Sequence, residues 1–392
     1  MTQPDKTIVI VGAGRIGRGF VGDLFAAAGY HLVLVDCLQP LVDRLRSAGR
    51  YTVVRFQGGD RRAEAEIACY MALHTGEEAE IAGAILQADL LAVAVYPQDF
   101  GAVAQELAPG LLARRERRPE VPLDLLLCTN LLHPGQRFRV PFREALPPDV
   151  RADVESHVGI VETVVIRIAT DPPPAERGRD PLQVWTNGYP DLLVERHAFK
   201  GPIPAGPGLR PVEDIEAQEV LKLYTYNTFH ASLAYLGARQ GHERVAECLA
   251  DAGVRAAAEG ALDEAARAVQ AEYGFSAQDM ARWVADLIRR TDIPALGDTV
   301  RRFGADPLRK LRRGDRLIGP ALLAHQHGIA TPYLARAVAA ALAFDVPGDV
   351  SATQVRERVT ALGIEGAVRE LCGLGDGEAG LIEEIVCAYE EC

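Results

Sequence analysis

The stretch TIVIVGAGRIGRGF at residues 7–20 constrains the fold more than any other part of the chain. A short apolar run with β-strand character leads into the pattern GxGxxG, and a segment with helical spacing follows. In such a unit the first glycine permits a tight turn, the second lets a pyrophosphate approach, and the third lets the helix pack on the strand. The helix start adds free N–H groups and partial positive charge. The loop residues that we expect to hold a dinucleotide are Gly12, Gly14, Arg15, Ile16 and Gly17.

The choice of dinucleotide depends on Asp36, which closes the next apolar run, HLVLVD, 19 residues after Gly17. An acid at this place binds the ribose hydroxyls of NAD and repels the additional phosphate of NADP. Cys37 and Leu38 follow it, so no arginine stands there to receive that phosphate. The sequence therefore predicts NAD as the cofactor. The alternative is a glycine turn that binds nothing.

The order of predicted elements changes along the chain. In the first part, apolar runs such as DLLAVAVY (89–96) and PLDLLLCTN (122–130) alternate with helical segments, which is typical of a parallel, doubly wound sheet. A stretch with more β character follows, and then a segment rich in proline and glycine at 200–214. We predict an α/β fold: a Rossmann-type NAD-binding domain over residues 1–200, followed by a mostly α-helical substrate-binding and catalytic domain over residues 201–392.

Composition argues against several classes of protein. The formal net charge of −12 disfavours a nucleic-acid partner. The longest apolar runs fall well short of the ~20 residues that cross a bilayer, and the N-terminus lacks the pattern of a secretory signal. The seven cysteines are scattered and form no CxxC pair, which disfavours a disulfide framework or a zinc site. We expect a cytoplasmic protein without a metal, membrane or nucleic-acid partner.

Lysine is rare in this chain, which has only Lys6, Lys200, Lys222 and Lys310 against 38 arginines. Arginine can replace lysine wherever only positive charge matters. It cannot do so where the side chain must lose its proton, because a guanidinium stays protonated. Each remaining lysine is therefore a candidate for a role that needs an amine.

Lys222 belongs to the segment KLYTYNTFH, which also contains Asn227 and His230 within a predicted helix over 215–240. At about 100° per residue, Asn227 lies about 140° and His230 about 80° round the helix from Lys222, so all three share one side. A buried lysine with a lowered pKa exchanges a proton near neutral pH. An asparagine amide and a histidine N–H can hold the oxygen of an alcohol or ketone. With a nicotinamide opposite, these groups suffice for alcohol–ketone interconversion without a metal. The alternative is a solvated lysine beside two ordinary core residues.

The segment KLYTYNTFHASLAYLGARQGH also resembles the catalytic helix of the polyol-specific long-chain dehydrogenase family. The signature of that family is a lysine, an asparagine five residues later and a histidine three after that. Other similar segments are VGAGRIGRGF, HVGIVETVVIRIA, DPLQV followed by ERHAFKG, and DPLRKLRRGDRLIGPALL at 306–323.

This resemblance implies a metal-independent enzyme, monomeric or weakly associating, that interconverts mannitol 1-phosphate and fructose 6-phosphate with NAD. It implies that Lys222 is the general acid/base and that Asn227 and His230 polarise and position the substrate. It also places Asn130, after the strand at 122–128, among the cofactor-binding residues. Glu219, three residues before Lys222, is a candidate proton relay or else an exposed helical glutamate.

The candidate substrate ligands are basic. The run DPLRKLRRGDR offers arginine forks that suit phosphate oxygens, and from it we select Arg309 and Lys310. Lys200, in the stretch FKG, is a third candidate. The alternative for these residues is a solvated charge or ordinary packing.

The chain departs from the pattern of its relatives at three places that bear on the substrate. Ile166 stands where relatives often have an acid, and Thr129 stands where the phosphate-specific enzymes often have a glutamate. The stretch Trp185-Thr186-Asn187 is also atypical. These departures leave the redox residues intact. They keep open a free polyol such as mannitol, a hexuronate, or a specialised sugar or cyclitol as the substrate.

Two other classes of function are alternatives. An NAD-binding sensor without catalysis need not retain a base that loses its proton, so the intact lysine–asparagine–histidine set argues against it. An isomerase or epimerase would use bound NAD only transiently. Net formation of NADH on addition of a polyol phosphate separates a dehydrogenase from both.

Overall fold

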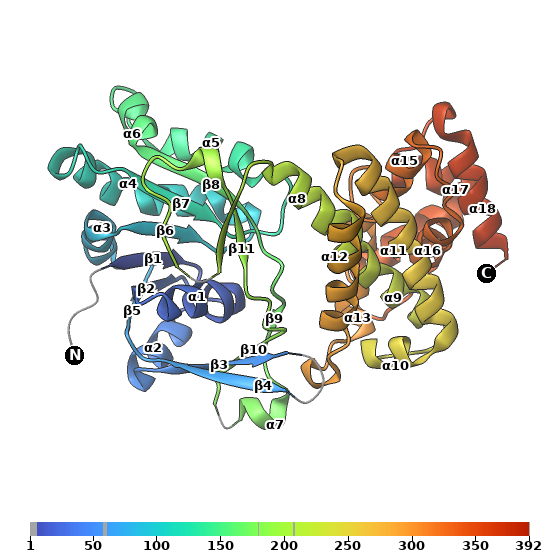
Figure 1. Ribbon diagram of the computed structural model, residues 1–392, viewed down its shortest axis with the longest axis horizontal. Coiled ribbons are helices and arrows are strands. Elements are labelled where there is room, and N and C mark those ends of the chain that lie inside the picture. The colour runs from blue at the N-terminus through green and yellow to red at the C-terminus, as the bar shows by residue number, and fades with distance from the viewer. Residues whose placement is uncertain (1–5, 58–60, 179, 207, 392) are drawn as a thin grey trace. The chain divides into compact units, whose positions relative to one another are not determined.

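The computed structural model describes residues 6–57, 61–178, 180–206 and 208–391 and divides into two compact units, Met1–Gln218 and Glu219–Cys392 (Figure 1). The first unit contains two β-sheets with helices around them. The second unit is helical.

Eight strands among the described residues form the larger sheet of the first unit, in the order β12-β11-β8-β7-β6-β1-β2-β5 (Figure 1). From β5 to β8 neighbouring strands are parallel, whereas β8 and β11 are antiparallel. This order confirms the predicted Rossmann-type, doubly wound domain. The strands are β1 (Thr7–Val11), β2 (His31–Asp36), β5 (Tyr70–His74), β6 (Leu90–Val93), β7 (Leu123–Leu127), β8 (Val158–Val164), β11 (Leu192–Glu195) and β12 (Leu209–Val212).

Helices cover both faces of this sheet, which explains why its central strands are apolar at successive positions. Ile8 and Ile10 of β1 belong to one buried cluster, whereas Val9 and Val11 belong to the other, because alternate side chains point to opposite faces. The helices and short helical turns of this layer are η1 (Gly17–Gly22), α1 (Asp23–Ala27), α2 (Gln39–Ala48), α3 (Glu78–Gln87), η2 (Pro97–Asp99), α4 (Phe100–Arg117), α5 (Pro134–Ala145), α6 (Arg151–His157) and η3 (Arg196–Ala198).

A second sheet of the first unit has the strand order β4-β3-β10-β9. Its elements, with one short neighbouring helix, are β3 (Tyr51–Phe56), β4 (Arg62–Ile67), β9 (Ala169–Thr170), α7 (Pro174–Arg177) and β10 (Val184–Thr186). The helical segment after the glycine loop packs closely on this sheet. A Cβ atom added at Gly22 would come 2.6 Å from the hydroxyl of Tyr51, so a glycine is needed there.

A buried ion-pair cluster joins the same helical segment to the second sheet. The carboxylate of Asp23, which is buried, accepts from Arg55 Nε at 2.8 Å and from Arg167 Nη1 at 2.5 Å. Arg167 also donates to the backbone oxygens of Gly19 and Tyr189 and lies over the ring of Phe20. The arginine that follows Ile166 therefore has a structural role.

The first unit extends beyond the predicted domain boundary at residue 200. Strand β12 pairs with β11 in the large sheet, with Leu209 opposite Leu192. This pairing ties the segment rich in proline and glycine to the first unit. Helix α8 (Ile215–Leu221) then carries the chain past Gln218.

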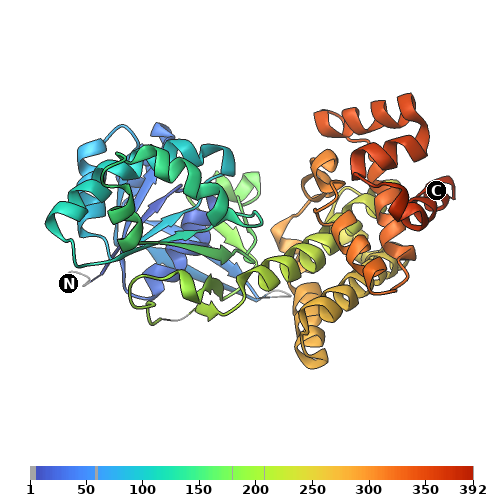
Figure 2. The same cartoon turned by 90° about the horizontal axis from the view of Figure 1, so that it is seen from above.

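The described residues of the second unit form helices joined by short segments (Figure 2). Helix α9 packs against α11, α13 and α16, and the alanines of α16 are buried. None of the helices in the described part of the chain is long and apolar enough for a membrane crossing. The helical elements are η4 (Lys222–Tyr226), α9 (Asn227–Arg239), α10 (Val245–Ala250), α11 (Ala252–Tyr273), α12 (Ala277–Thr291), η5 (Pro294–Leu296), α13 (Val300–Gly304), α14 (Pro307–Lys310), α15 (Ile318–Gln326), α16 (Pro332–Leu342), α17 (Val350–Cys372), η6 (Asp376–Glu378) and α18 (Ala379–Glu390).

Candidate active site

The glycine loop has the geometry that a dinucleotide site needs. Gly12 has a positive φ of 97°, and a Cβ atom there would lie 2.5 Å from the carbonyl oxygen of Ala94. A Cβ atom at Gly17 would overlap the carbonyl oxygen of Gly12. At Gly14, in contrast, no heavy atom of the described residues, other than its chain neighbours, lies within 4 Å of the place of a Cβ. The loop is therefore tightly folded but leaves its backbone open at the second glycine, where a pyrophosphate would approach.

Asp36 ends strand β2, and its Oδ1 accepts from the backbone N–H of Leu38 at 2.9 Å. This bond orients the carboxylate at the carboxyl edge of the sheet, where ligands of doubly wound folds bind. Arg15 is half exposed, with its Nε 3.6 Å from Asp171 Oδ2. Ile16 packs partly against the core, and Asn130 is exposed. The predicted cofactor residues thus all lie in the first unit.

The predicted catalytic residues all lie in the second unit, on one continuous helical segment with a π-helical turn. Residues 222–226 form the π-helix η4, and the N–H of Asn227 donates to the carbonyl oxygen of Lys222. A bond to the fifth residue back sets the two residues about one turn apart. The helix was predicted, but its uniform α-helical spacing was not correct at this turn.

Lys222 is 8% exposed, and burial lowers its pKa to about 7. The positive charges of Arg316 and Arg309 add to this effect, whereas the negative charge of Glu219 opposes it. A substantial fraction of this amine is therefore uncharged at neutral pH. Such a group can accept a proton and return it.

Asn227 is 6% exposed, and its side-chain Nδ2 is buried without a hydrogen-bond partner among the described residues. A buried donor that lacks an acceptor costs about 1–3 kcal/mol, so such groups call for an explanation. A ligand oxygen would supply the acceptor, and the donor would then stabilise negative charge that develops on that oxygen.

His230 lies one turn further along the same helix and is held by aromatic rings. It stacks on Phe303 with the ring centroids 4.2 Å apart and meets Tyr226 edge to face at 4.5 Å. Its Nε2 lies 3.1 Å from the hydroxyl of Thr291. Burial, together with the positive charges of Arg302 and other nearby cations, lowers the pKa of His230 well below its ordinary value, so the ring is neutral.

The basic run at 309–316 is largely engaged within the second unit. Lys310 is 4% exposed, and its Nζ donates to the carbonyl oxygen of Phe303. Arg309 Nε bonds Asp306 at 2.9 Å, and Arg316 Nε bonds Asp315 at 2.7 Å. Both arginines are therefore already paired with carboxylates.

Lys200, the third predicted substrate ligand, lies in the first unit. Its side chain is exposed, and its backbone N–H donates to Asp124 Oδ1 at 2.7 Å. The assignments of Lys200, Arg309 and Lys310 to the substrate stay predictions.

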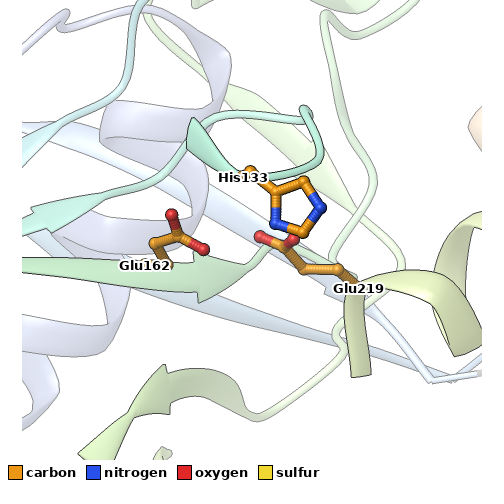
Figure 3. Close-up of side chains that lie close together, drawn as sticks. All are labelled: His133, Glu162 and Glu219. Carbon is orange, nitrogen blue, oxygen red and sulfur yellow. The ribbon is translucent and has the colours of Figure 1, made fainter. Parts of the chain in front are cut away.

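Two polar residues of the first unit were not singled out from the sequence. Glu162, on β8, accepts from the N–H of Gly135 at 2.7 Å, and a Cβ at that glycine would lie 2.6 Å from Glu162 Oε1. His133 precedes α5 with a left-handed φ of 50°. Figure 3 shows both side chains, together with Glu219 of the second unit. The signal for Glu162 was an acid inside the apolar run HVGIVETVV.

Comparison with known families decides where the chain belongs. A profile described as the mannitol dehydrogenase Rossmann domain matches residues 6–206, and one described as the mannitol dehydrogenase C-terminal domain matches residues 214–365. The chain belongs to the mannitol dehydrogenase family. This membership confirms the resemblance to polyol-specific dehydrogenases, and Lys222, Asn227 and His230 all lie within the second match.

Two solved structures share the fold of the chain. Pseudomonas fluorescens mannitol 2-dehydrogenase, in a ternary complex with NAD and D-mannitol, is 15% identical with a TM-score of 0.76; the match covers 100% of this chain and 93% of that one. A D-sorbitol dehydrogenase in substrate-free form is 13% identical with a TM-score of 0.79, covering 98% and 92% of the two chains. At these identities the likeness concerns the fold alone, across nearly the whole chain.

Proposed function

We propose that this member of the mannitol dehydrogenase family is an NAD-dependent polyol dehydrogenase in which Lys222 is the general acid/base. The observation that carries the proposal is the burial of Lys222, which lowers its pKa to about 7, one turn from the unpartnered amide of Asn227. The solved mannitol 2-dehydrogenase is a complex with NAD and D-mannitol, which supports the same ligand classes here.

The choice of cofactor rests on residues of the first unit. The open backbone at Gly14 and the helical turn that begins at Arg15 would hold the pyrophosphate, and Asp36 would accept from the ribose hydroxyls. NAD, when bound, supplies the acceptor for the hydride. We expect NAD to be preferred to NADP, because the carboxylate of Asp36 would repel the additional phosphate.

The second unit supplies the proton chemistry. In the oxidation, the uncharged amine of Lys222 would take the hydroxyl proton of the alcohol whose carbon gives up the hydride. The amide of Asn227 donates to the substrate oxygen as its negative charge develops. In the reduction, the ammonium of Lys222 returns the proton to the ketone oxygen. Glu219, whose charge raises the pKa of Lys222, is a candidate to relay the proton onward.

The finer proposal concerns the substrate. The sequence resemblance favours mannitol 1-phosphate and fructose 6-phosphate, the activity of a mannitol-1-phosphate 5-dehydrogenase, with Lys200, Arg309 and Lys310 as phosphate ligands. A second candidate is an unphosphorylated polyol. It is supported by the pairing of Arg309 with Asp306, because a phosphate would have to displace or compete with that carboxylate.

We further propose that the protein acts in the cytoplasm, as the scattered cysteines indicate, and as a monomer or weak homo-oligomer, as the family resemblance implies. The defining experiment is a screen for NADH formation with mannitol, sorbitol, their phosphates, hexuronates and cyclitols, run with NAD and with NADP. A dehydrogenase forms NADH with at least one of these alcohols, and Lys222→Ala abolishes most of the signal. Lack of turnover across the panel, in both directions, would contradict the proposal. It would favour an NAD-binding sensor without catalysis.

A further inference from the structure

The hydrogen bonds around Thr291 determine which nitrogen of His230 carries the proton. Thr291 is the last residue of α12, and its side chain is buried. Its hydroxyl donates to the carbonyl oxygen of Leu287 at 2.9 Å, within the same helix. The same oxygen lies 3.1 Å from Nε2 of His230. Thr291 therefore contacts a carbonyl on one side and an imidazole on the other.

A proton count leaves one arrangement for these three groups. A hydroxyl has a single proton, and a carbonyl oxygen has none. The proton of Thr291 must therefore point to Leu287, which leaves lone pairs of the hydroxyl oxygen facing His230. A hydrogen bond between the two is then possible only if Nε2 of His230 carries the proton and donates it.

The other ring nitrogen of His230 then has a lone pair. The ring is neutral, since burial and the charges of Arg302 and Lys222 oppose a second proton. Within the described residues, Nδ1 has no hydrogen-bond partner, and the side chain is only half-buried. Stacking on Phe303 and the edge-to-face contact with Tyr226 resist a turn of the ring. Nδ1 is thus a preformed acceptor.

We propose that Thr291 is a positioning residue that fixes His230 as a hydrogen-bond acceptor, so that Nδ1 receives an O–H of the substrate. In place of the N–H donor that the sequence led us to expect, the helix then presents one donor, the amide of Asn227, and one acceptor, His230. This reading rests on the proposed function for the identity of the ligand.

The pair of groups selects a chemical class. An alcohol with several hydroxyls offers both a lone pair for Asn227 and an O–H for His230. A carboxylate or phosphate oxygen offers only lone pairs at neutral pH. The groups that contact His230 should therefore be free hydroxyls of a polyol, whether or not a phosphate is attached elsewhere on the molecule.

The tautomer is measured by NMR on the full chain labelled with ¹⁵N-histidine. His230→Gln assigns the His230 signals by their disappearance. We expect the wild-type ring to be protonated at Nε2, Thr291→Ser to retain this state, and Thr291→Val to produce a mixture of tautomers. A wild-type His230 ring protonated at Nδ1 would by itself overturn the proposal. A folded Thr291→Val variant whose His230 signals match those of the wild type would also overturn it.

A kinetic arm tests the consequence for binding. With the substrate found in the screen, Thr291→Val should raise the KM for the polyol about tenfold, the size expected for one lost hydrogen bond, while the KM for NAD stays unchanged. Thr291→Ser should recover most of the wild-type KM. An equal increase in the KM values for NAD and for the polyol would indicate a merely structural role. If no alcohol is turned over, the proposed function fails, and the NMR result still decides the tautomer.

Discussion

The backbone N–H of Asn227 donates to the carbonyl oxygen of Lys222, five residues earlier. This π-helical bond brings the two side chains about one turn apart, so the proposed base and the proposed oxyanion donor serve the same side of the helix. π-Helical turns often occur at functional sites. The local distortion of the helix therefore supports a functional role for this turn.

Replacement of Lys222 by alanine should lower kcat by a factor on the order of 10² to 10⁴, the usual contribution of a general acid–base group. The affinity for NAD should barely change, because the proposed cofactor residues lie in the first unit. Steady-state kinetics and calorimetric NAD titration give the two values. Lys6→Ala, at an exposed lysine, is the matched control. Near-wild-type turnover of Lys222→Ala would remove the proposed proton carrier.

The two directions of the reaction should depend on pH in opposite senses. Oxidation needs the uncharged amine of Lys222, whose pKa is lowered to about 7, so kcat should rise with pH and level off above that value. Reduction needs the ammonium, so its kcat should fall above the same pH. Initial rates between about pH 5.5 and pH 9 measure both profiles. Profiles that bend in the same direction would show that another group controls the rate.

Asp36→Ala should relax the preference for NAD over NADP. The variant loses hydrogen bonds to the ribose and the repulsion of the additional phosphate, and we expect the ratio of kcat/KM values to fall about 10- to 100-fold. The comparison is made with one alcohol and both cofactors. Asp43→Ala, on the neighbouring helix α2 with an exposed side chain, is the control. An unchanged ratio in Asp36→Ala would refute the ribose contact.

The Rossmann-type part could be predicted because its signals are local. The apolar run of β1, the glycines of the turn and the acid that ends β2 each lie within a short stretch. The second sheet could not be predicted in this way, since β3 pairs with β10 from a distant part of the sequence. The pairing of Asp23 with Arg167 could not be predicted either, because the two residues lie far apart in the sequence.

The sequence nominates Lys222, Asn227 and His230 as the catalytic residues, and these roles stay predictions. Their geometry could not be predicted, because uniform α-helical spacing misplaced Asn227. Within the π-helix, the hydroxyl of Thr225 donates back to the carbonyl oxygen of Leu221 and accepts from Trp283 Nε1 at 2.8 Å. Such back-bonding distorts helices, and Trp283 comes from the separate helix α12. No local sequence pattern predicts a contact between side chains of two separate helices.

Loss of the Asp23 carboxylate should lower the stability of the first unit. Asp23→Asn would leave the buried charges of Arg55 and Arg167 without their carboxylate, and breaking a buried pair costs about 3–5 kcal/mol. Urea unfolding followed by circular dichroism measures the change in free energy of unfolding. Asp153→Asn removes the exposed partner of Arg115 and should cost less than about 1 kcal/mol. Equal effects of the two variants would show that the buried cluster contributes little.

The buried amine of Lys222 should lower the free energy of unfolding at neutral and acidic pH. Its pKa is about 7 in the folded protein against 10.5 as an ordinary value, so the unfolded chain binds more protons between these pH values. The free energy of unfolding contributed by this group therefore rises with pH across that window. Below it, the folded protein carries a buried ammonium at a cost of a few kcal/mol.

Lys222→Met removes this titration while keeping an unbranched side chain. The variant should be more stable than the wild type by a few kcal/mol at about pH 6, and the difference should shrink as pH approaches about 10. Urea unfolding at a series of pH values measures it, with Lys6→Met as the exposed control. A stability difference that does not change with pH would mean that the amine of Lys222 keeps an ordinary pKa, and the proposed base would lose its physical support.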